Sequence, residues 1–168
     1  MAIGSSAMCG TFKREILAGI HRLTAHTRAS STISADTFKV AMFTNSASID
    51  ADTTGYTTSN EESGTNYSAG GATLSSVTIG LADNSSAVPT AFVDFADTTF
   101  SSSTISSARG ALIYNSTLSS AGTGSTTNHA ADPAVAVINF GGDKSSSAGD
   151  FTIQYPANDA NNAIIRIS

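Results

Sequence analysis

From residue 37 onward the sequence alternates between short apolar runs, rich in β-branched and aromatic residues, and clusters of Gly, Ser, Asp and Asn. Runs of this kind are typical of strands, and the clusters between them are typical of turns. We expect strands at 37–44, 72–81, 90–96, 108–115, 134–140, 150–155 and 163–167. About seven or eight strands would form a mainly β fold, either an antiparallel β-sandwich or a partly closed barrel.

The pattern inside the runs indicates which side chains face the core. Val77, Ile79 and Leu81 fall on one face of their strand, as expected when one face of a sheet is buried. The run 134–140 is apolar nearly throughout, which predicts a central strand. The Ser-, Thr- and Gly-rich segments are predicted to be surface connections, the last of them a hairpin tip: 100–107, 116–129 and 141–150.

One amphipathic helix is predicted near the N-terminus, over residues 8–23. Its apolar side chains recur at the spacing of one helix face: Phe12, Ile16, Ile20 and Leu23. Its charged residues fall elsewhere around the helix: Lys13, Arg14 and Arg22. Gly19 should weaken the helix by about 1 kcal/mol relative to Ala.

This helix supports two interpretations: it covers the sheet of its own chain, or it docks on a neighbouring subunit. In the second case it supplies the partner-binding side chains: Phe12, Lys13, Arg14, Ile16, Ile20 and Arg22. The corresponding division of the chain is an N-terminal arm and helix, 1–36, followed by a β-sandwich body, 37–168.

Composition favours a single packed domain. A chain of 168 residues with 40% hydrophobic residues and a net charge of −5 has enough apolar side chains for one core. The single Cys9 excludes an intrachain disulfide and is expected to be structural. The opening residues do not resemble a secretory signal, and no segment approaches the roughly 20 apolar residues of a membrane span, so we expect a soluble protein made in the cytosol.

Charge is distributed unevenly along the chain. A weakly basic front precedes an acidic body, and its cations are Lys13, Arg14, Arg22, Arg28 and Lys39. Such a front favours association with an acidic protein surface. Nucleic acid is not the expected partner, because no aromatic residues interleave with the cations and the acidic body would repel phosphate.

No pattern of catalytic residues stands out, and we do not expect an enzyme. The Gly-x-Ser-x-Gly elbow of serine hydrolases is absent, and for the three histidines we prefer surface or capping roles: His21, His26 and His129. Asp50 and Asp52 are weak candidates for a hard cation, but the calcium-loop pattern around them is absent. We therefore predict no metal and no cofactor.

The segment 56–71 carries the densest pattern of polar and turn-forming residues in the chain. Gly70 and Gly71 are explained by turn geometry, because no Lys and no helix follow them as in a phosphate-binding loop. Tyr56 and Tyr67 are the candidates for a glycan- or receptor-binding loop, because sugars stack on exposed aromatic rings. The chain has no Trp, which makes such a site harder to build.

Four segments carry a resemblance to a family of small structural proteins of tailed bacteriophages, notably those of cyanobacteria and marine bacteria. They are Phe-Lys-Val-Ala-Met-Phe-Thr at 38–44, the segment 56–71, Ala-Arg-Gly-Ala-Leu-Ile-Tyr-Asn at 108–115, and 140–156. Phe-Lys-Arg-Glu-Ile-Leu at 12–17 is similar to the helix that opens these proteins. The Ser/Thr-rich stretch 119–132 departs from the family pattern by its length.

The resemblance implies a virion component, assembled in the host cytoplasm. A capsid decoration, or cement, protein that binds the head surface through its N-terminal segment is the first expectation. A tail, collar or fibre-associated component, with a receptor-binding role, is the alternative. The implied partners are the major capsid protein or other virion proteins, together with further copies of the chain. A trimer would suit the threefold sites that cement proteins often occupy.

Overall fold

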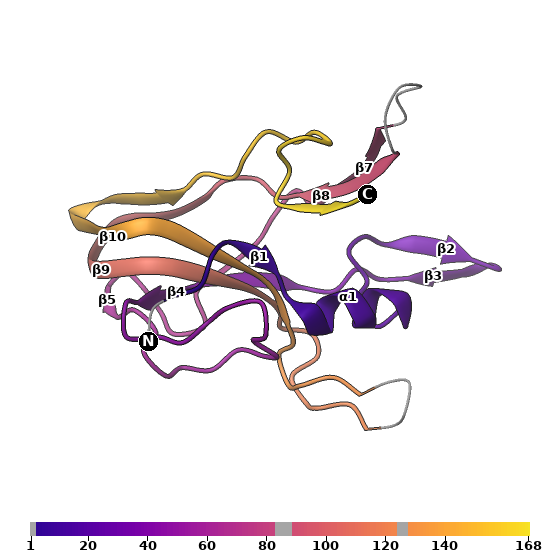
Figure 1. The fold of residues 1–168 in the computed structure, drawn as a ribbon, viewed down its shortest axis with the longest axis horizontal. Helices are drawn as coiled ribbons and strands as arrows, with labels where there is room; N and C mark the ends of the chain where they lie inside the picture. The colour runs from indigo at the N-terminus through magenta and orange to yellow at the C-terminus, as the bar shows by residue number, and fades with distance from the viewer. Residues whose placement is uncertain (1–2, 83–88, 124–127) are drawn as a thin grey trace.

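The computed structural model describes residues 3–82, 89–123 and 128–168, except for the side chain of Arg28. The fold is mainly β with one short helix, as predicted, and its sheets are antiparallel (Figure 1). The elements in chain order are β1 (Ala7–Met8), α1 (Gly10–Leu17), β2 (His26–Arg28), β3 (Ser31–Ile33), β4 (Phe38–Thr44), β5 (Gly64–Thr65), β6 (Ala72–Thr73), β7 (Thr78–Ala82), β8 (Thr90–Asp94), β9 (Thr98–Asn115), β10 (Ala134–Ile153) and β11 (Ile165–Ile167).

The strands form three sheets. A six-stranded sheet has the order β1-β10-β9-β4-β6, with β5 pairing to β9; a three-stranded sheet has the order β11-β8-β7; and β2 pairs with β3 in a separate hairpin. The segment between the helix and β4 holds the β2–β3 hairpin, and the predicted strand 72–81 is divided between β6 and β7. The arrangement is sandwich-like and is not a closed barrel.

β9 and β10 are much longer than the predicted runs, and both turn back on themselves at the left edge of Figure 1. In a straight strand, Phe140 and Phe151 would lie about 36 Å apart at roughly 3.3 Å per residue. Their ring centroids are 6.3 Å apart. The corner includes Gly141 at a φ of 72°, and the register with β9 shifts between Asn139 and Lys144. Bulges of this kind bend strands sharply.

The segments 100–107 and 141–150, which we predicted to be connections, are therefore parts of these two strands. Hydroxyl groups of β9 bond to those of β10 across the strand pair. Thr99 Oγ1 lies 2.9 Å from Thr152 Oγ1, and Ser103 Oγ lies 3.1 Å from Ser146 Oγ. Such cross-strand pairs stabilise a sheet with few apolar side chains. The third predicted connection, 116–129, is outside the strands where it is described, and its residues 124–127 lie outside the described part.

The core lies between the two layers that the corner joins. The lower layer in Figure 1 holds β4 together with the end of β9 and the start of β10, which we call their inner halves. The upper layer holds the start of β9 and the end of β10, which we call their outer halves, together with β7, β8 and β11. Aromatic rings meet between the layers, with centroids 6.4 Å apart for Phe38 and Phe95 and 5.2 Å for Tyr67 and Phe100. Residues 134–137 are all buried, so the prediction of a central strand is confirmed for the first half of β10.

The helix is shorter than predicted. α1 ends at Leu17, because Gly19 adopts a φ of 68° and the N–H of Ile20 donates to the carbonyl of Glu15, which closes the helix in a Schellman-type turn. Ile20 and Leu23 therefore lie beyond the helix. Phe12 is fully buried in the same core as the strands, together with Ile3 and Cys9, so the first 36 residues and the β body share one core.

Candidate functional site

The segment 56–71 is organised around the Glu61 carboxylate. Oε2 of Glu61 accepts a hydrogen bond from the Tyr56 hydroxyl at 2.6 Å, and Oε1 accepts from the Tyr67 hydroxyl and from the Gly70 N–H, both at 2.8 Å. The Tyr114 hydroxyl donates to the Gly70 carbonyl at 2.8 Å, and the Tyr114 ring stacks on that of Tyr56 at 4.5 Å. We call these five residues the Glu61 cluster.

This cluster fastens the loop to the sheet. The Tyr67 hydroxyl also accepts the N–H of Met42 in β4 at 2.8 Å, and Tyr67 is only 8% exposed. Burial, hydrogen bonding to Glu61 and its charge raise the pKa of Tyr67 well above the usual 10, although the Met42 N–H opposes the shift. Burial and the charges of Asp132 and Glu61 raise that of Tyr114 to about 12. Tyr67 therefore offers no exposed ring for a sugar, and Tyr56 is half-buried against Tyr114.

A second buried polar cluster ties α1 and the following segment to β9. Asp36 accepts the N–H and Nε–H of Arg22 at 2.9 and 3.0 Å and the Asn115 amide at 2.8 Å. Nδ2 of Asn115 also lies 3.0 Å from Nδ1 of His21, and Nε2 of His21 lies 2.8 Å from Oε2 of Glu15. We call Glu15, His21, Arg22, Asp36 and Asn115 the Asp36 cluster.

The hydrogen-bond pattern assigns the protons of His21. Because the Asn115 amide donates to Nδ1, that nitrogen is the acceptor, and Nε2 carries the proton that is donated to Glu15. The His21 and Glu15 side chains are 0% and 1% exposed. Burial lowers the pKa of His21, although hydrogen bonding to Glu15 and the charges of Glu15 and Asp36 oppose the shift. His21 is thus a buried structural group and not a surface or capping one.

The predicted partner-binding residues separate into two groups. Phe12 is fully buried and Arg22 is held by Asp36, so both stabilise the protein's own fold. Ile16 and Ile20 are half-buried. Lys13 and Arg14 are exposed on α1, and Arg14 also donates to the Asn128 carbonyl at 2.6 Å. The helix therefore covers the core with one side and presents cations on another.

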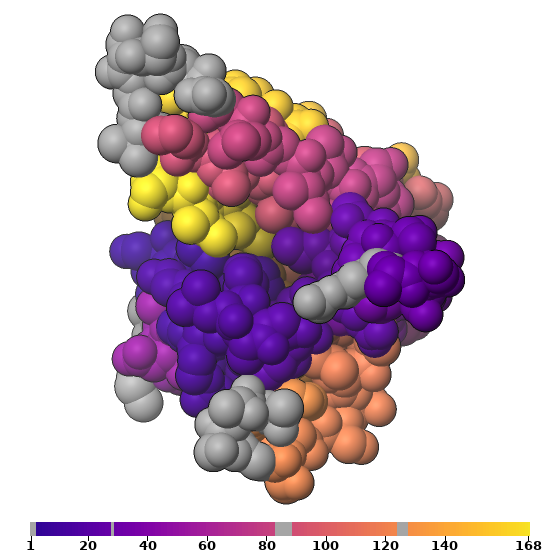
Figure 2. Space-filling view, turned by 90° about the vertical axis from the view of Figure 1, so that its right-hand side faces the viewer, coloured from indigo at the N-terminus to yellow at the C-terminus, as the bar shows by residue number. Residues whose placement is uncertain are grey.

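Among the residues that the structure describes, four large apolar side chains are exposed, all on elements at one end of the molecule: Leu17 on α1, Ile79 and Leu81 on β7, and Ile167 on β11. Figure 2 looks onto this end, where α1 lies below the C-terminal strand and β7. The register pairs Leu81 with Ala91 and Ala91 with Ile167, so these side chains share one face of the three-stranded sheet. We call this region the end face.

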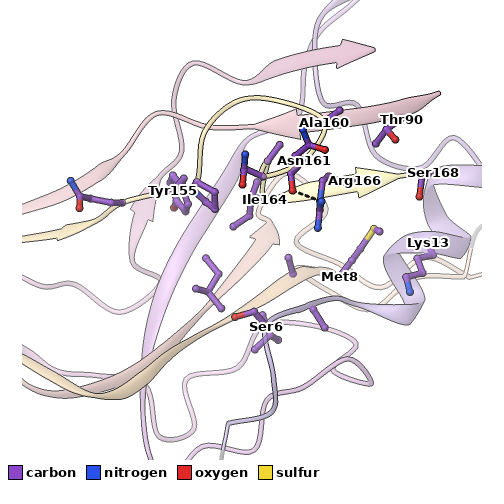
Figure 3. A pocket seen from close by; sticks show the side chains of 18 residues that line it. Ser6, Met8, Lys13, Thr90, Tyr155, Ala160, Asn161, Ile164, Arg166 and Ser168 are labelled. Carbon is purple, nitrogen blue, oxygen red and sulfur yellow. Dashed lines mark hydrogen bonds between the residues drawn. The ribbon is translucent and has the colours of Figure 1, made fainter. Parts of the chain in front are cut away.

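A groove of about 780 Å³ lies between the two layers, beside the end face (Figure 3). β1 and β10 line one wall, and residues 154–168 line the other. Lys13 and Arg166 approach it from opposite walls, while Tyr155 lies toward the other end of the view. None of the residues of the two buried clusters lines this groove.

The remaining candidates have local structural roles. Asp50 Oδ1 accepts the N–H of Asp52 at 2.9 Å, which closes a turn. Among the described residues, no group of three or more His, Cys, Asp or Glu side chains could hold a metal ion. Burial, together with the charges of Asp50 and Glu15, raises the pKa of the Cys9 thiol to about 12, so it remains protonated at neutral pH. No described helix has the length and apolar character that crossing a membrane requires.

Comparisons with known proteins found no matching family model, curated protein or solved structure. Sequence reasoning found the segment 56–71 and the cations of α1. It missed the Asp36 cluster, whose members are up to 100 positions apart, from Glu15 to Asn115, and it missed the groove, which exists only because two distant strands lie opposite each other.

Proposed function

We propose that this chain is a structural protein of a tailed-bacteriophage virion, and that it decorates the head surface as a cement protein. The proposal starts from the resemblance carried by 12–17, 38–44, 56–71, 108–115 and 140–156. The observation that supports it best is the end face, where apolar side chains are exposed beside the cations of α1. Leu17 is 90% exposed and Leu81 is 67% exposed, and exposed apolar side chains that gather in one region of a surface mark interaction sites.

The chemistry of this end suits an acidic protein surface. Exposed Lys13 and Arg14 flank the apolar side chains, whereas the chain as a whole carries a net charge of −5. A local positive region on an acidic protein orients it as it approaches an acidic partner, and the apolar contacts then stabilise the bound state. The major capsid protein is the partner that we propose.

Cementing does not require a strong interface from each copy. An interface of about 1,000 Å² is enough when many copies act together on one particle. We also propose that the chain forms a homo-oligomer, and a trimer would match threefold positions on a shell.

The test is to remove the gene from the phage that encodes it. If the chain is a cement protein, heads made without it should still assemble but should break at a lower temperature, because a bound protein stabilises the assembled state. Intact, heat-resistant heads without infectivity would instead assign the chain to the tail, collar or fibre. Added protein should restore heat resistance, and Leu17→Glu should not. Lys144→Glu, which changes an exposed cation on β10, serves as the control and should restore it.

A further inference from the structure

The groove is the open side of the sandwich. β1 is the outermost strand of the six-stranded sheet, β11 is the outermost strand of the three-stranded sheet, and residues of both line the groove. The two strands do not pair with each other. An outermost strand offers backbone N–H and C=O groups to an additional strand. The geometry therefore suits an extended chain that enters between the two sheets.

The walls favour a peptide over a sugar. The groove has a mixed lining, in which polar residues alternate with apolar side chains from both layers, among them Met8, Ile138 and Ile164. Tyr155 is the one aromatic residue among the described residues that line it, and its ring packs on Phe95 with centroids 6.2 Å apart. A sugar would need a free aromatic face, whereas alternate side chains of an extended peptide can contact an apolar wall.

The charge in the groove identifies the kind of peptide. Lys13 and Arg166 line it, and no acidic side chain is among the described lining residues. Arg166 donates a hydrogen bond to the Asn161 carbonyl and interacts with the charge of Asp159. The Asp159 carboxylate, however, is already bound by the N–H groups of Asn161 and Asn162, at 2.8 and 2.9 Å. Two cations facing one groove in an acidic protein are complementary to a ligand that carries carboxylates.

We propose that this groove binds an extended acidic segment of a partner protein. The segment lies between β1 and β11, its apolar side chains contact Met8, Ile138 and Ile164, and its carboxylates meet Lys13 and Arg166. Binding of such a segment does not depend on the virion assignment, because any partner that carries one could occupy the groove.

The experiment is a selection with the isolated full chain. The probe is a bead library of randomised peptides of about seven residues, enough to span a typical strand. We expect the bound peptides to be enriched in Asp and Glu alternating with apolar residues. For the best of them, fluorescence anisotropy should show at least about tenfold weaker binding to the double variant Lys13→Glu/Arg166→Glu. N-methylation of alternate backbone amides should weaken binding by a similar factor, because it removes strand pairing.

Matched controls separate this site from a general charge effect. Lys144→Glu changes an exposed cation outside the groove and should alter binding less than about twofold. Circular dichroism of each variant establishes that the chain is folded. Backbone NMR shifts on peptide addition should concentrate at 6–8 and 164–167. The proposal is overturned if no acidic peptides are enriched, if the double variant binds them as well as the parent, or if the shifts map to another surface.

Discussion

The Glu61 and Asp36 clusters both fasten another segment of the chain to the sheet through a carboxylate, but the groups that donate to the carboxylate differ. In the Glu61 cluster the carboxylate is surrounded by neutral donors, the hydroxyls of Tyr56 and Tyr67 and the Gly70 N–H. In the Asp36 cluster the donors include the Arg22 guanidinium, and His21 lies next in the network. The first cluster therefore depends on hydrogen-bond geometry, whereas the second depends on charge and on the protonation of an imidazole.

The largest difference should appear when the carboxylate of the charged cluster is removed. Asp36→Ala leaves the Arg22 guanidinium without its acceptor and removes one of the two acceptors of the buried Asn115 amide, which keeps Nδ1 of His21. Loss of one partner from a buried ion pair typically costs about 3–5 kcal/mol, and the half-exposed Arg22 places the expected loss at the lower end. Urea denaturation measures this loss. Asp143→Ala is the control: it removes the partly exposed partner of Arg109 and should cost less than about 1 kcal/mol of unfolding free energy. An equal loss in both variants would contradict the stabilising role given to Asp36.

A smaller effect is expected in the neutral cluster. Tyr67→Phe removes one hydroxyl, which leaves the buried Met42 N–H without its acceptor and Glu61 with one donor fewer. An unsatisfied buried donor costs about 1–3 kcal/mol in unfolding free energy. Tyr56→Phe is the matched control. Because Tyr56 is only half-buried, water can replace its hydroxyl as a donor to Glu61, so this variant should lose less unfolding free energy than Tyr67→Phe in the same denaturation experiment. The reverse order would contradict the role given to Tyr67.

The two clusters should also respond to opposite changes in pH. The pKa of His21 is lowered in the folded state, so its contribution to stability is present above pH 6.5 and is lost as the pH falls. The pKa of Tyr114 is raised to about 12, so its contribution is present below pH 10 and is lost as the pH rises through that value.

The unfolding free energy measured from pH 5 to 11 should therefore decline at both ends. His21→Gln should flatten the acid decline, and Tyr114→Phe should reduce the alkaline one, to which Tyr67 and Cys9 also contribute because their pKa values are raised as well. His26→Gln, which changes an exposed histidine, should leave both slopes unchanged. If the His21 and Tyr114 variants keep the slopes of the parent, the pH dependence of the unfolding free energy does not come from these clusters.

The smallest stability effect should come from the end face. Leu17→Glu changes a side chain that is 90% exposed and should alter the unfolding free energy by less than about 0.5 kcal/mol. The same denaturation experiment checks this value. A large destabilisation would mean that Leu17 belongs to the core, and its effect on particle binding could then not be separated from folding.

The sequence predicted strands where apolar residues are dense. β4, β8 and the inner halves of β9 and β10 follow β-branched and aromatic runs, which need burial wherever they occur. It did not predict strand at 100–107 and 141–149, because Ser103 and Ser146 bond across a strand pair and such pairing leaves no local signal. The end of α1 could have been predicted, since Gly19 is the expected residue beyond a helix, but Ile20 and Leu23 continued the apolar period and obscured it.

The two polar clusters also depend on contacts between distant residues, which leave no local signal in the sequence. The sequence marked the segment 56–71 as distinctive, but whether a tyrosine is exposed or buried depends on its distant neighbours, and Tyr67 is buried because its hydroxyl meets Met42. Asp36, His21 and Asn115 stand in unrelated local patterns. Their association follows from the antiparallel register that places Phe38 opposite Asn115, which no short window of sequence contains.

The corner at Gly141 has a consequence for how the protein unfolds. Because β9 and β10 each pass through both layers, neither layer can detach while the other keeps its pairing, and the domain should unfold as one cooperative unit. The two layers have no such connection where β1 and β11 end their sheets, so we expect partial opening between the layers there. Amide hydrogens of these two short strands should therefore exchange with solvent before those of the inner halves of β9 and β10, and a segment bound between them would slow that exchange.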